Sequence, residues 1–527
     1  MQHARRLFLL DAARLAAAAT AATPSLVLSA PPSNRAGYPF GLGVASGAPL
    51  PDSVILWTRI LPDPLDASSS PRLAVPLRWE VAHDEAFRNI VAHGSAIATP
   101  ELAHSVRVNV TGLQPARWYW YRFMLGDAVS PAGRTRTAPA AGSMPDVLKL
   151  AVASCQHWEF GSYAAHRHIA AAHPDLVAFL GDYIYEWGAY QLQHPQRAVR
   201  RDESFTLDDY RRRYAQYKSD PQLQAAHLAA PWIVTWDDHE VANDYAALRD
   251  ERLSATFAQR RAAAYQAFYE HMPLRLPAPK HFASVRMLQR VDWGRLARFH
   301  VLDDRQYRAV QACPRPNAGG SSSVTARACP ALLDPRRSML GAEQEAWLEA
   351  GLRSSNARWN VLAQQTLMAP SSQVPTATAD GGRVWTDGWD GYPAARRRLL
   401  DTLATTRAAN PLVLGGDVHT FYATELRRDF SRPASKANPL VATEFVGTSV
   451  TSSSRPQERT AQYVAMNPHI KYGRSDKRGW MLLEVTPKEV RTRFLGLDDV
   501  RDAGSAQRVL AQFRVKDGKA GVEQTAG

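Results

Sequence analysis

The chain has 527 residues, of which 45% are hydrophobic and 21% charged, an ordinary globular composition that excludes a disordered tail protein, a collagen and a coiled-coil rod. No apolar run reaches the ~18 residues of a membrane-spanning helix, which excludes a polytopic membrane protein. The 63 Lys and Arg outnumber the 50 Asp and Glu, which gives a net charge of +13. Because the basic residues are scattered along the chain, we interpret this charge as a solvated basic surface and do not predict a nucleic-acid partner.

The first 30 residues resemble an export signal. Arg5 and Arg6 precede Leu7 and Phe8, and an alanine-rich apolar stretch follows over residues 15–28. Paired arginines before a short apolar stretch are typical of a twin-arginine signal. We therefore predict a cleaved signal at residues 1–30, the twin-arginine export machinery as a partner, and a periplasmic or secreted monomer without a stable membrane anchor. The alternative is an amphipathic first helix of the mature fold.

Residues 38–137 have the pattern of a small β-sandwich domain. Short segments of alternating polarity are separated by turn residues, which is typical of antiparallel strands. These predicted strands cover residues 53–59, 77–81, 105–110 and 118–123. A segment rich in Ala, Pro and Gly follows at residues 138–145 and indicates a linker.

Residues 146–510 have the pattern of an α/β layered domain, because short apolar segments alternate with helical ones. The predicted strands cover residues 148–153, 175–180, 232–236, 297–302, 360–363 and 411–414. The predicted helices cover residues 162–172, 208–217, 255–271, 342–352 and 392–405.

The three cysteines are best explained by one disulfide and one free thiol. Cys313 and Cys329 flank a segment rich in Pro, Gly and Ser. An oxidising compartment would let them bond, and closing this 15-residue loop would contribute about 3 kcal/mol. Cys155 is then unpaired, and a free thiol in an exported protein needs a reason.

Four of the apolar segments end in polar residues. The motifs at these ends are Cys155-Gln156, Gly181-Asp-Tyr-Ile-Tyr-Glu186, Asp237-Asp-His-Glu240 and Gly415-Gly-Asp-Val-His419. Ligands of open α/β sheets bind at the carboxyl ends of strands, so we expect the four ends to converge. Carboxylates, imidazoles and a thiolate together predict a metal site, whereas any single acidic end could be a helix N-cap or a turn.

These four motifs, with Ala153-Ser154 before the first and Trp236 and Val241 around the third, resemble those of the PhoD-like alkaline phosphatases. That family is a branch of the calcineurin-like metallophosphoesterases. The resemblance covers residues 38 to about 500. It implies a metallophosphoesterase-type βαβ layered sandwich, preceded by the small N-terminal β-sandwich domain.

The resemblance implies an iron(III)–calcium centre. Cys155 and Tyr185 would bind Fe(3+), and Asp182 would bridge the two metals. Asp238 would bind the second metal, Ca(2+), and Asn243 is a further candidate there. Asp238 stands where most of the superfamily has an asparagine.

The remaining implied ligands come from later in the chain. Gln364 occupies the position of a histidine that most of the superfamily has, and an amide oxygen suits calcium better than iron. Asp417 and His419 form the last metal-binding motif. Which residue binds which metal is left open by the sequence.

Two further residues are predicted to act on the phosphate group. His239 would lie beside it and either stabilise the transition state or protonate the leaving oxygen, while a metal-bridging hydroxide attacks phosphorus. Arg305 would bind phosphate bidentately, and the alternative is an ion pair with Asp303 or Asp304. Ser154 is expected to point to the opposite face from Cys155, which excludes it as a nucleophile.

Three tryptophans, Trp187, Trp385 and Trp389, either line a pocket or pack in the core. The motifs together predict an exported alkaline phosphatase and phosphodiesterase whose substrates are phosphate monoesters and diesters. A diesterase specialised for phospholipids or teichoic acids is the nearest alternative. A binding protein without turnover and an iron redox enzyme are the others.

Overall fold

The structure, a computed structural model, describes residues 37–64, 66, 69–189, 197, 202–376 and 381–526. The predicted signal at residues 1–30 lies outside these ranges, so export stays a prediction. Among the described helices, none is both long and apolar enough to span a bilayer.

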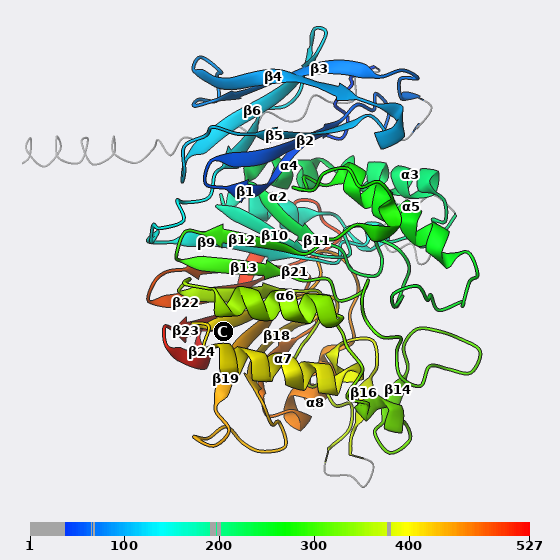
Figure 1. The fold of residues 1–527 in the computed structure, drawn as a ribbon, viewed down its shortest axis with the longest axis vertical. Helices are drawn as coiled ribbons and strands as arrows, with labels where there is room; N and C mark the ends of the chain where they lie inside the picture. Colours follow the sequence, from blue (N-terminus) through cyan, green and yellow to red (C-terminus); the bar gives the residue numbers. More distant parts are fainter. Residues whose placement is uncertain are drawn as a thin grey trace, which may run out of the picture. The chain divides into compact units, whose positions relative to one another are not determined.

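Two large sheets dominate the described chain (Figure 1). The ten-stranded sheet has the order β24 (Lys519–Ala526), β23 (Gln507–Lys516), β22 (Glu489–Leu497), β21 (Gly479–Val485), β9 (Leu148–Ala153), β10 (Leu176–Leu180), β11 (Trp232–Thr235), β1 (Val44–Leu50), β2 (Ser53–Arg59) and β5 (Ser105–Val110). The seven-stranded sheet has the order β12 (Gln289–Trp293), β13 (Ala297–Val301), β15 (Trp359–Ala363), β17 (Pro411–Gly415), β19 (Leu440–Val446), β18 (Phe421–Arg427) and β20 (Ile470–Arg474).

Helices cover the outer faces of these two sheets. They are α2 (Ala164–Ala171), α3 (Leu207–Lys218), α4 (Pro221–Ala229), α5 (Phe257–His271), α6 (Ala342–Arg353), α7 (Pro393–Thr406) and α8 (Gln457–Met466). One apolar cluster joins β9, β10 and β11 to α2–α5, a second fills the space between the sheets, and a third joins the seven-stranded sheet to α6 and α7. This helix–sheet–sheet–helix arrangement confirms the predicted layered sandwich (Figure 1).

The central strands of each sheet run parallel, which sets the position of the site. β9, β10 and β11 are parallel neighbours, and so are β13, β15, β17 and β19. β10 and β11 are apolar and buried throughout because both faces of the sheet are covered. This explains why their bounds were predicted to within two residues.

The N-terminal region has two β layers, but one of them continues into the central sheet. A second sheet contains β4 (Ile90–Ala98), β3 (Val75–Ala82), β6 (Trp118–Leu125), β7 (Ala128–Val129) and β8 (Gly133–Arg136). It shares an apolar core with β1, β2 and β5. β1 also pairs with β11 through Gly47 and Trp232, so the predicted sandwich shares a sheet with the rest of the chain. The predicted domain bounds stay predictions.

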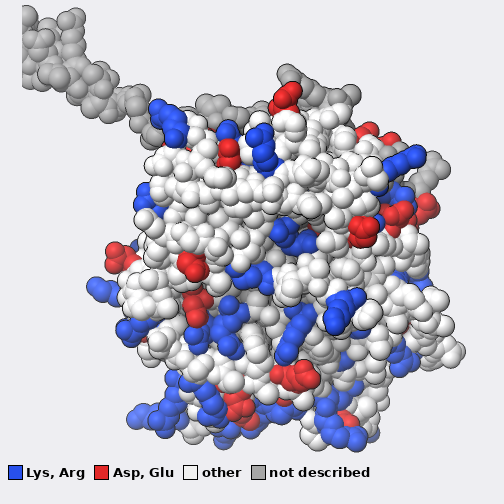
Figure 2. Space-filling view, turned by 45° about the horizontal axis from the view of Figure 1, so that its top comes forward, with Lys and Arg blue, Asp and Glu red and all other residues white. Residues whose placement is uncertain are grey.

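Charged side chains are dispersed over the face drawn in Figure 2, where Asp and Glu lie among Lys and Arg. The ion pairs of the described chain show the same mixing, since exposed arginines such as Arg353 and Arg508 pair with neighbouring carboxylates. Such exposed pairs contribute little to stability.

The predicted disulfide between Cys313 and Cys329 is present, with its Cα atoms 6.1 Å apart. Cys329 packs with Ala312 and Leu332, and Val324 and Val384 lie against this small cluster. Val324 and Val384 belong to a two-stranded ribbon, β14 (Ser323–Thr325) and β16 (Arg383–Trp385). The disulfide therefore holds a segment whose own apolar core is small.

Replacing Cys313 and Cys329 by serine together should lower the free energy of unfolding of this segment by about 3 kcal/mol, because the open loop regains chain entropy. The measurement is the rate of limited proteolysis within the segment around residues 313–329. Adding a reductant should accelerate cleavage of the natural protein and leave the double variant unchanged. Equal cleavage rates for the two proteins without reductant would contradict the prediction.

Candidate metal centre

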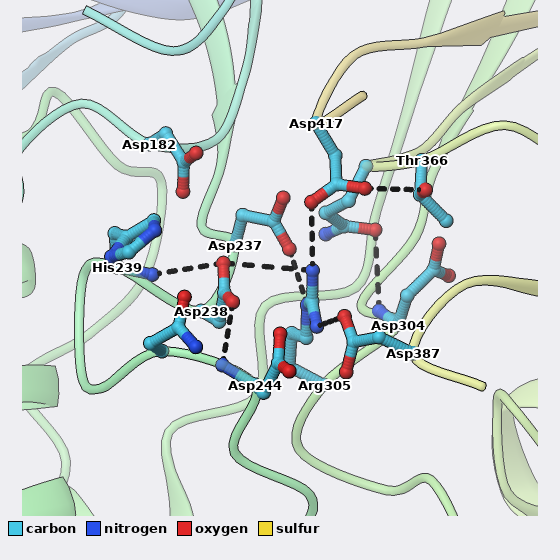
Figure 3. Close-up of polar contacts among 12 residues, drawn as sticks. Asp182, Asp237, Asp238, His239, Asp244, Asp304, Arg305, Thr366, Asp387 and Asp417 are labelled. Atoms are coloured by element: carbon cyan, nitrogen blue, oxygen red, sulfur yellow. Dashed lines mark hydrogen bonds and ion pairs between the residues drawn. The ribbon is translucent and has the colours of Figure 1, made fainter. Parts of the chain in front are cut away.

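Polar residues from both sheets meet where the parallel strands end (Figure 3). Cys155 follows β9, Asp182 follows β10, Asp237 and Asp238 follow β11, and Asp417 follows β17. Atoms of these residues that could bind a metal form groups whose members lie within 4.8 Å of one another. The predicted convergence of the four strand ends is therefore present in the fold.

The backbone is strained at these strand ends. Cys155, Asp182, Asp417 and His419 have φ angles of 60°, 56°, 60° and 53°. Non-glycine residues rarely adopt this left-handed conformation, and it is common where function requires a particular side-chain direction. The strain also corrects one prediction, because the chain stops alternating after β9. The Sγ of Cys155 lies 3.2 Å from the Oγ of Ser154, so the two side chains do not point to opposite faces.

The first group contains Cys155, Asp182 and His419. The phenol of Tyr185 joins it, since its O–H donates to Asp182 Oδ2 at 2.8 Å and lies 3.3 Å from His419 Nε2. His419 Nδ1 donates to the carbonyl oxygen of Ser453 at 2.6 Å. This bond fixes the ring orientation and leaves Nε2 as the nitrogen that faces the group. Cys155 and Tyr185 were predicted to bind iron and Asp182 to bridge the two metals, whereas the metal bound by His419 was left open.

The donors of this group fit a cation. Burial and the Asp182 carboxylate raise the pKa of the Cys155 thiol well above its usual value, and the same two causes raise the pKa of Tyr185. Asp182 Oδ1 is buried and has no hydrogen-bond partner among the described residues. A buried carboxylate oxygen without a partner is costly, and a bound cation would satisfy it while ionising the thiol.

The second group contains Asp182, Asp238 and His239, so it shares Asp182 with the first. His239 Nδ1 is 2.7 Å from Glu186 Oε2, and its ring packs against the rings of Tyr185 and Trp187 with centroids 4.2 and 4.4 Å away. Burial would lower the pKa of His239, but Glu186 and the two aspartates outweigh it and raise that pKa well above its ordinary value. Glu186 belongs to one of the four motifs, but no local sequence pattern indicates that it pairs with His239.

Two further groups consist of carboxylates alone. Asp237, Asp238 and Asp417 form one, and Asp238, Asp244 and Asp387 form the other. Oxygen-only donor sets of this kind suit calcium. Asp237, Asp244 and Asp387 were not predicted as ligands, although Asp237 directly precedes the predicted ligand Asp238.

Arg305 lies at the centre of these carboxylates rather than facing an open phosphate position (Figure 3). Its Nε bonds to Asp237 and its Nη1 to Asp387, while Nη2 lies 3.2 Å from Asp417 and 3.5 Å from Asp238. Its side chain is 1% exposed. The arrangement makes Arg305 a counterion for the acidic groups, and its predicted phosphate contact stays a prediction.

The alternative prediction for Arg305, an ion pair with Asp303 or Asp304, does not describe its side chain. Asp303 instead accepts the backbone N–H of Arg305 at 3.0 Å. Asp304 is buried, and its carboxylate has no hydrogen-bond partner among the described residues. Burial raises the pKa of Asp304 to about 7.

Two predicted calcium ligands are placed differently from the rest. The amide oxygen of Gln364 accepts hydrogen bonds from the Trp389 indole at 3.0 Å and from the backbone N–H of Thr366 at 3.2 Å. Thr366 in turn donates its hydroxyl to Asp417 at 2.7 Å. Gln364 thus supports the residue that positions Asp417. Asn243 donates its backbone N–H to Glu186 at 2.7 Å, and both residues remain predicted ligands only.

A serine- and threonine-rich loop after β19 completes the site, and it was not predicted. The hydroxyl of Ser452 lies 2.7 Å from the Tyr185 hydroxyl and 2.9 Å from the carbonyl oxygen of Cys155. Arg478 donates to the carbonyl oxygen of Ser452 at 2.6 Å. A run of small hydroxyl residues looks like a linker in the sequence, so no local signal separates this loop from one.

Glu240 ties two strand ends together. Its carboxylate accepts the backbone N–H groups of Asp182 at 3.1 Å, Tyr183 at 2.6 Å and Asp237 at 2.7 Å. These bonds join the ends of β10 and β11 and hold Asp182 in its strained conformation. Glu240 is a positioning residue that supports both candidate metal-binding groups.

Glu240→Gln should lower the free energy of unfolding by about 1–3 kcal/mol, because an amide nitrogen replaces one acceptor and leaves a buried N–H without a partner. Chemical denaturation of the chelated protein measures this. Glu343→Gln on α6 is the control, since its side chain is 89% exposed, and surface changes usually stay within about 0.5 kcal/mol. A Glu240→Gln protein as stable as the control would contradict the inference that Glu240 holds the ends of β10 and β11 together.

The chain is similar to known phosphatases in sequence. The sequence profile of the PhoD-like phosphatase matches residues 150–494, and that of the PhoD-like phosphatase N-terminal domain matches residues 25–139. The chain is 44% identical over 501 residues to alkaline phosphatase D of Bacillus subtilis, covering 94% of this chain and 83% of that protein.

Solved structures give the same result. A structure of PhoD is 43% identical and superposes with a TM-score of 0.86, covering 94% of this chain and 93% of that one. The purple acid phosphatase PPD1 from yellow lupin seeds superposes with a TM-score of 0.56 over 90% of this chain and 73% of that one. It is 12% identical, so it supports the fold alone.

Proposed function

This chain belongs to the PhoD-like phosphatase family, a family of phosphoric ester hydrolases, and from that premise we propose that it is an exported, iron- and calcium-dependent alkaline phosphatase and phosphodiesterase. One observation carries the proposal. Two adjacent metal-binding groups share the carboxylate of Asp182, and the first contains a thiol while the second contains oxygen and nitrogen donors. A shared carboxylate between two unlike donor sets suits a pair of unlike cations.

The type of donor atom indicates which metal each residue would bind. Cys155, Asp182, Tyr185 and His419 would hold iron, because a thiolate and a phenolate suit Fe(3+). Asp238 and its neighbouring carboxylates would hold calcium. When bound, two such cations activate water and neutralise the phosphoryl oxygens.

His239 would protonate the leaving group. Glu186 holds its Nδ1 at 2.7 Å, so Nε2 is the nitrogen that can reach the substrate. The rings of Tyr185 and Trp187 fix the plane of the imidazole. A positioned imidazole in this place can donate a proton to the leaving oxygen of a phosphoester.

Export is supported by two features of the chain. Arg5 and Arg6 precede an apolar stretch, as in twin-arginine signals. The Cys313–Cys329 disulfide is stable where thiols are oxidised, as in the periplasm or outside the cell.

Hydrolysis of 4-nitrophenyl phosphate and of bis(4-nitrophenyl) phosphate at pH 7–10 tests the proposal, with metal analysis of the same protein. We expect turnover of both esters, its loss on chelation, and its recovery when calcium is restored to a protein that has kept its iron. Turnover that survives complete removal of both metals, or none with both metals bound, would overturn it.

A further inference from the structure

A cavity of about 410 Å³ opens directly from the metal centre. Its lining includes Asp417 and His419, each of which belongs to a metal-binding group. A phosphoryl group held at those groups would therefore direct one of its ester substituents into this cavity. The cavity is large enough for a small organic group, and its lining decides which one.

Four aromatic side chains from separate segments line part of the cavity wall. Trp385 comes from β16, Trp389 from the short 3-10 helix Trp389–Gly391 before α7, Tyr422 from β18 and Tyr463 from α8. The sequence left open whether Trp385 and Trp389 line a pocket or pack in the core. Both belong to the lining, and Trp389, which is 1% exposed, also packs in the apolar cluster under α6 and α7. Leu367 adds an aliphatic surface. Flat, apolar walls of this kind favour planar, apolar ligands over hydrated polyols.

The cavity also presents one cation. The guanidinium of Arg455 lies over the ring of Tyr463, 4.9 Å from its centroid, and no described acidic side chain forms an ion pair with it. The acidic residue Asp390 also lines the cavity, but its carboxylate bonds to Arg396 and accepts the backbone N–H of Ser371 at 2.8 Å. Away from the metal centre, the charged group of the lining that is available to a ligand is therefore the positively charged Arg455.

The wall that carries Trp385 is supported by the disulfide segment. Trp385 pairs with Ser323 across the β14–β16 ribbon, and the valines of that ribbon pack against Cys329. Gln373 adds a backbone bond to Arg383 at 2.7 Å. The disulfide therefore holds a wall of the cavity in place, which gives this otherwise remote bond a function.

We propose that this cavity binds the organic substituent of the phosphoester and selects planar, apolar groups that carry an additional negative charge. Trp385, Trp389 and Tyr463 would contact the planar group, and Arg455 would meet the charge. This inference rests on the proposed function and names its substrate class. It favours aryl-type substituents over the glycerol and sugar substituents of teichoic acids.

Competitive inhibition by substrate analogues tests the first part. Methylphosphonate and phenylphosphonate share the phosphoryl group, so the ratio of their inhibition constants reports the cavity alone. We expect phenylphosphonate to bind about 10- to 100-fold more tightly, as burial of an aromatic ring in an apolar site predicts. Trp385→Ala should lower the ratio several-fold, because one of the three aromatic contacts is removed. Trp347→Ala, which changes a half-buried tryptophan on α6 outside the cavity, should leave the ratio unchanged.

Arg455→Gln tests whether Arg455 selects substituents that carry a negative charge. The natural protein should bind 4-carboxyphenylphosphonate more tightly than phenylphosphonate, and the variant should lose that preference while keeping its preference for phenyl over methyl. Tyr463→Leu is the second wall variant if Trp385→Ala does not fold. Equal inhibition by methyl- and phenylphosphonate in an enzyme that hydrolyses 4-nitrophenyl phosphate would overturn this inference alone. Absence of hydrolysis with both metals bound would instead overturn the proposed function.

Discussion

Replacing Asp182 by asparagine should lower kcat for phosphoester hydrolysis about a thousandfold, because bound metals supply several kcal/mol of transition-state stabilisation. Asp182 is the one residue common to the Cys155–His419 group and the Asp238–His239 group. Asparagine keeps the size of the side chain but offers a single neutral oxygen, which cannot serve two cations. Metal analysis of the variant should show loss of metal together with loss of turnover.

The same substitution should not destabilise the chelated protein. Burial raises the pKa of Asp182 well above its ordinary value, and although His239 opposes this, Asp238 and Glu240 raise it further. A neutral amide removes that repulsion. Urea unfolding in the presence of a chelator measures the difference.

Asp304→Asn is the matched control for Asp182→Asn. Asp304 is also a buried aspartate, but it belongs to none of the metal-binding groups of the described chain. Its replacement should leave kcat within a few-fold of the natural value. An Asp182→Asn protein that keeps more than a tenth of the natural turnover would show that the shared carboxylate is not required.

The sequence was sufficient to predict the parallel core and the residues at its strand ends. β9, β10 and β11 are short apolar segments followed by polar residues, and that pattern is local. The strand-end rule then placed Cys155, Asp182 and Asp417 together without any knowledge of the pairing. Local pattern and a general rule were enough here because parallel strands must end at the same edge.

The antiparallel C-terminal strands were not predicted. β21 pairs with β9 across most of the chain, and β22, β23 and β24 extend the sheet outward from it. Nothing local indicates which earlier strand β21 will join. The Ser452 loop was missed for the same reason, since its function arises only when β19 brings it beside Tyr185.

Pairing of charges was equally invisible in the sequence. Arg305 and Asp387 are 82 residues apart, and Arg305 and Asp237 are 68 apart. The sequence showed an arginine after a strand, for which a phosphate contact and a local ion pair were the natural predictions. The actual partners depend on how four loops meet, which only the tertiary structure determines.

Replacing Arg305 by methionine should lower the free energy of unfolding of the chelated protein by about 3–5 kcal/mol, the usual effect of removing one partner from a buried ionic network. Four carboxylates, those of Asp237, Asp238, Asp387 and Asp417, would lose their common counterion. Methionine fills much of the same volume, so the loss would reflect charge rather than a cavity. Urea unfolding measures it.

The loss of stability caused by Arg305→Met should increase with pH. Burial already raises the pKa of Asp417 to about 6 even though Arg305 opposes it, so removing Arg305 must raise it further. The folded variant then binds protons that the unfolded chain, with an ordinary aspartate pKa near 3.8, has released. Stability of the variant relative to the natural protein must therefore fall as pH rises from about 5 to about 8.

Calcium should restore part of the lost stability, because a cation that binds the folded acidic groups and not the unfolded chain adds about 2.7 kcal/mol at one hundred times its Kd. Arg308→Met is the matched control, since Arg308 is equally buried but, among the described residues, forms an ion pair with Asp387 alone. The Arg308→Met protein should lose less unfolding free energy than the Arg305→Met protein, and its loss should depend less on calcium. If the Arg305→Met and Arg308→Met proteins lost the same stability at every calcium concentration, Arg305 would be an ordinary structural ion pair rather than the counterion of a metal centre.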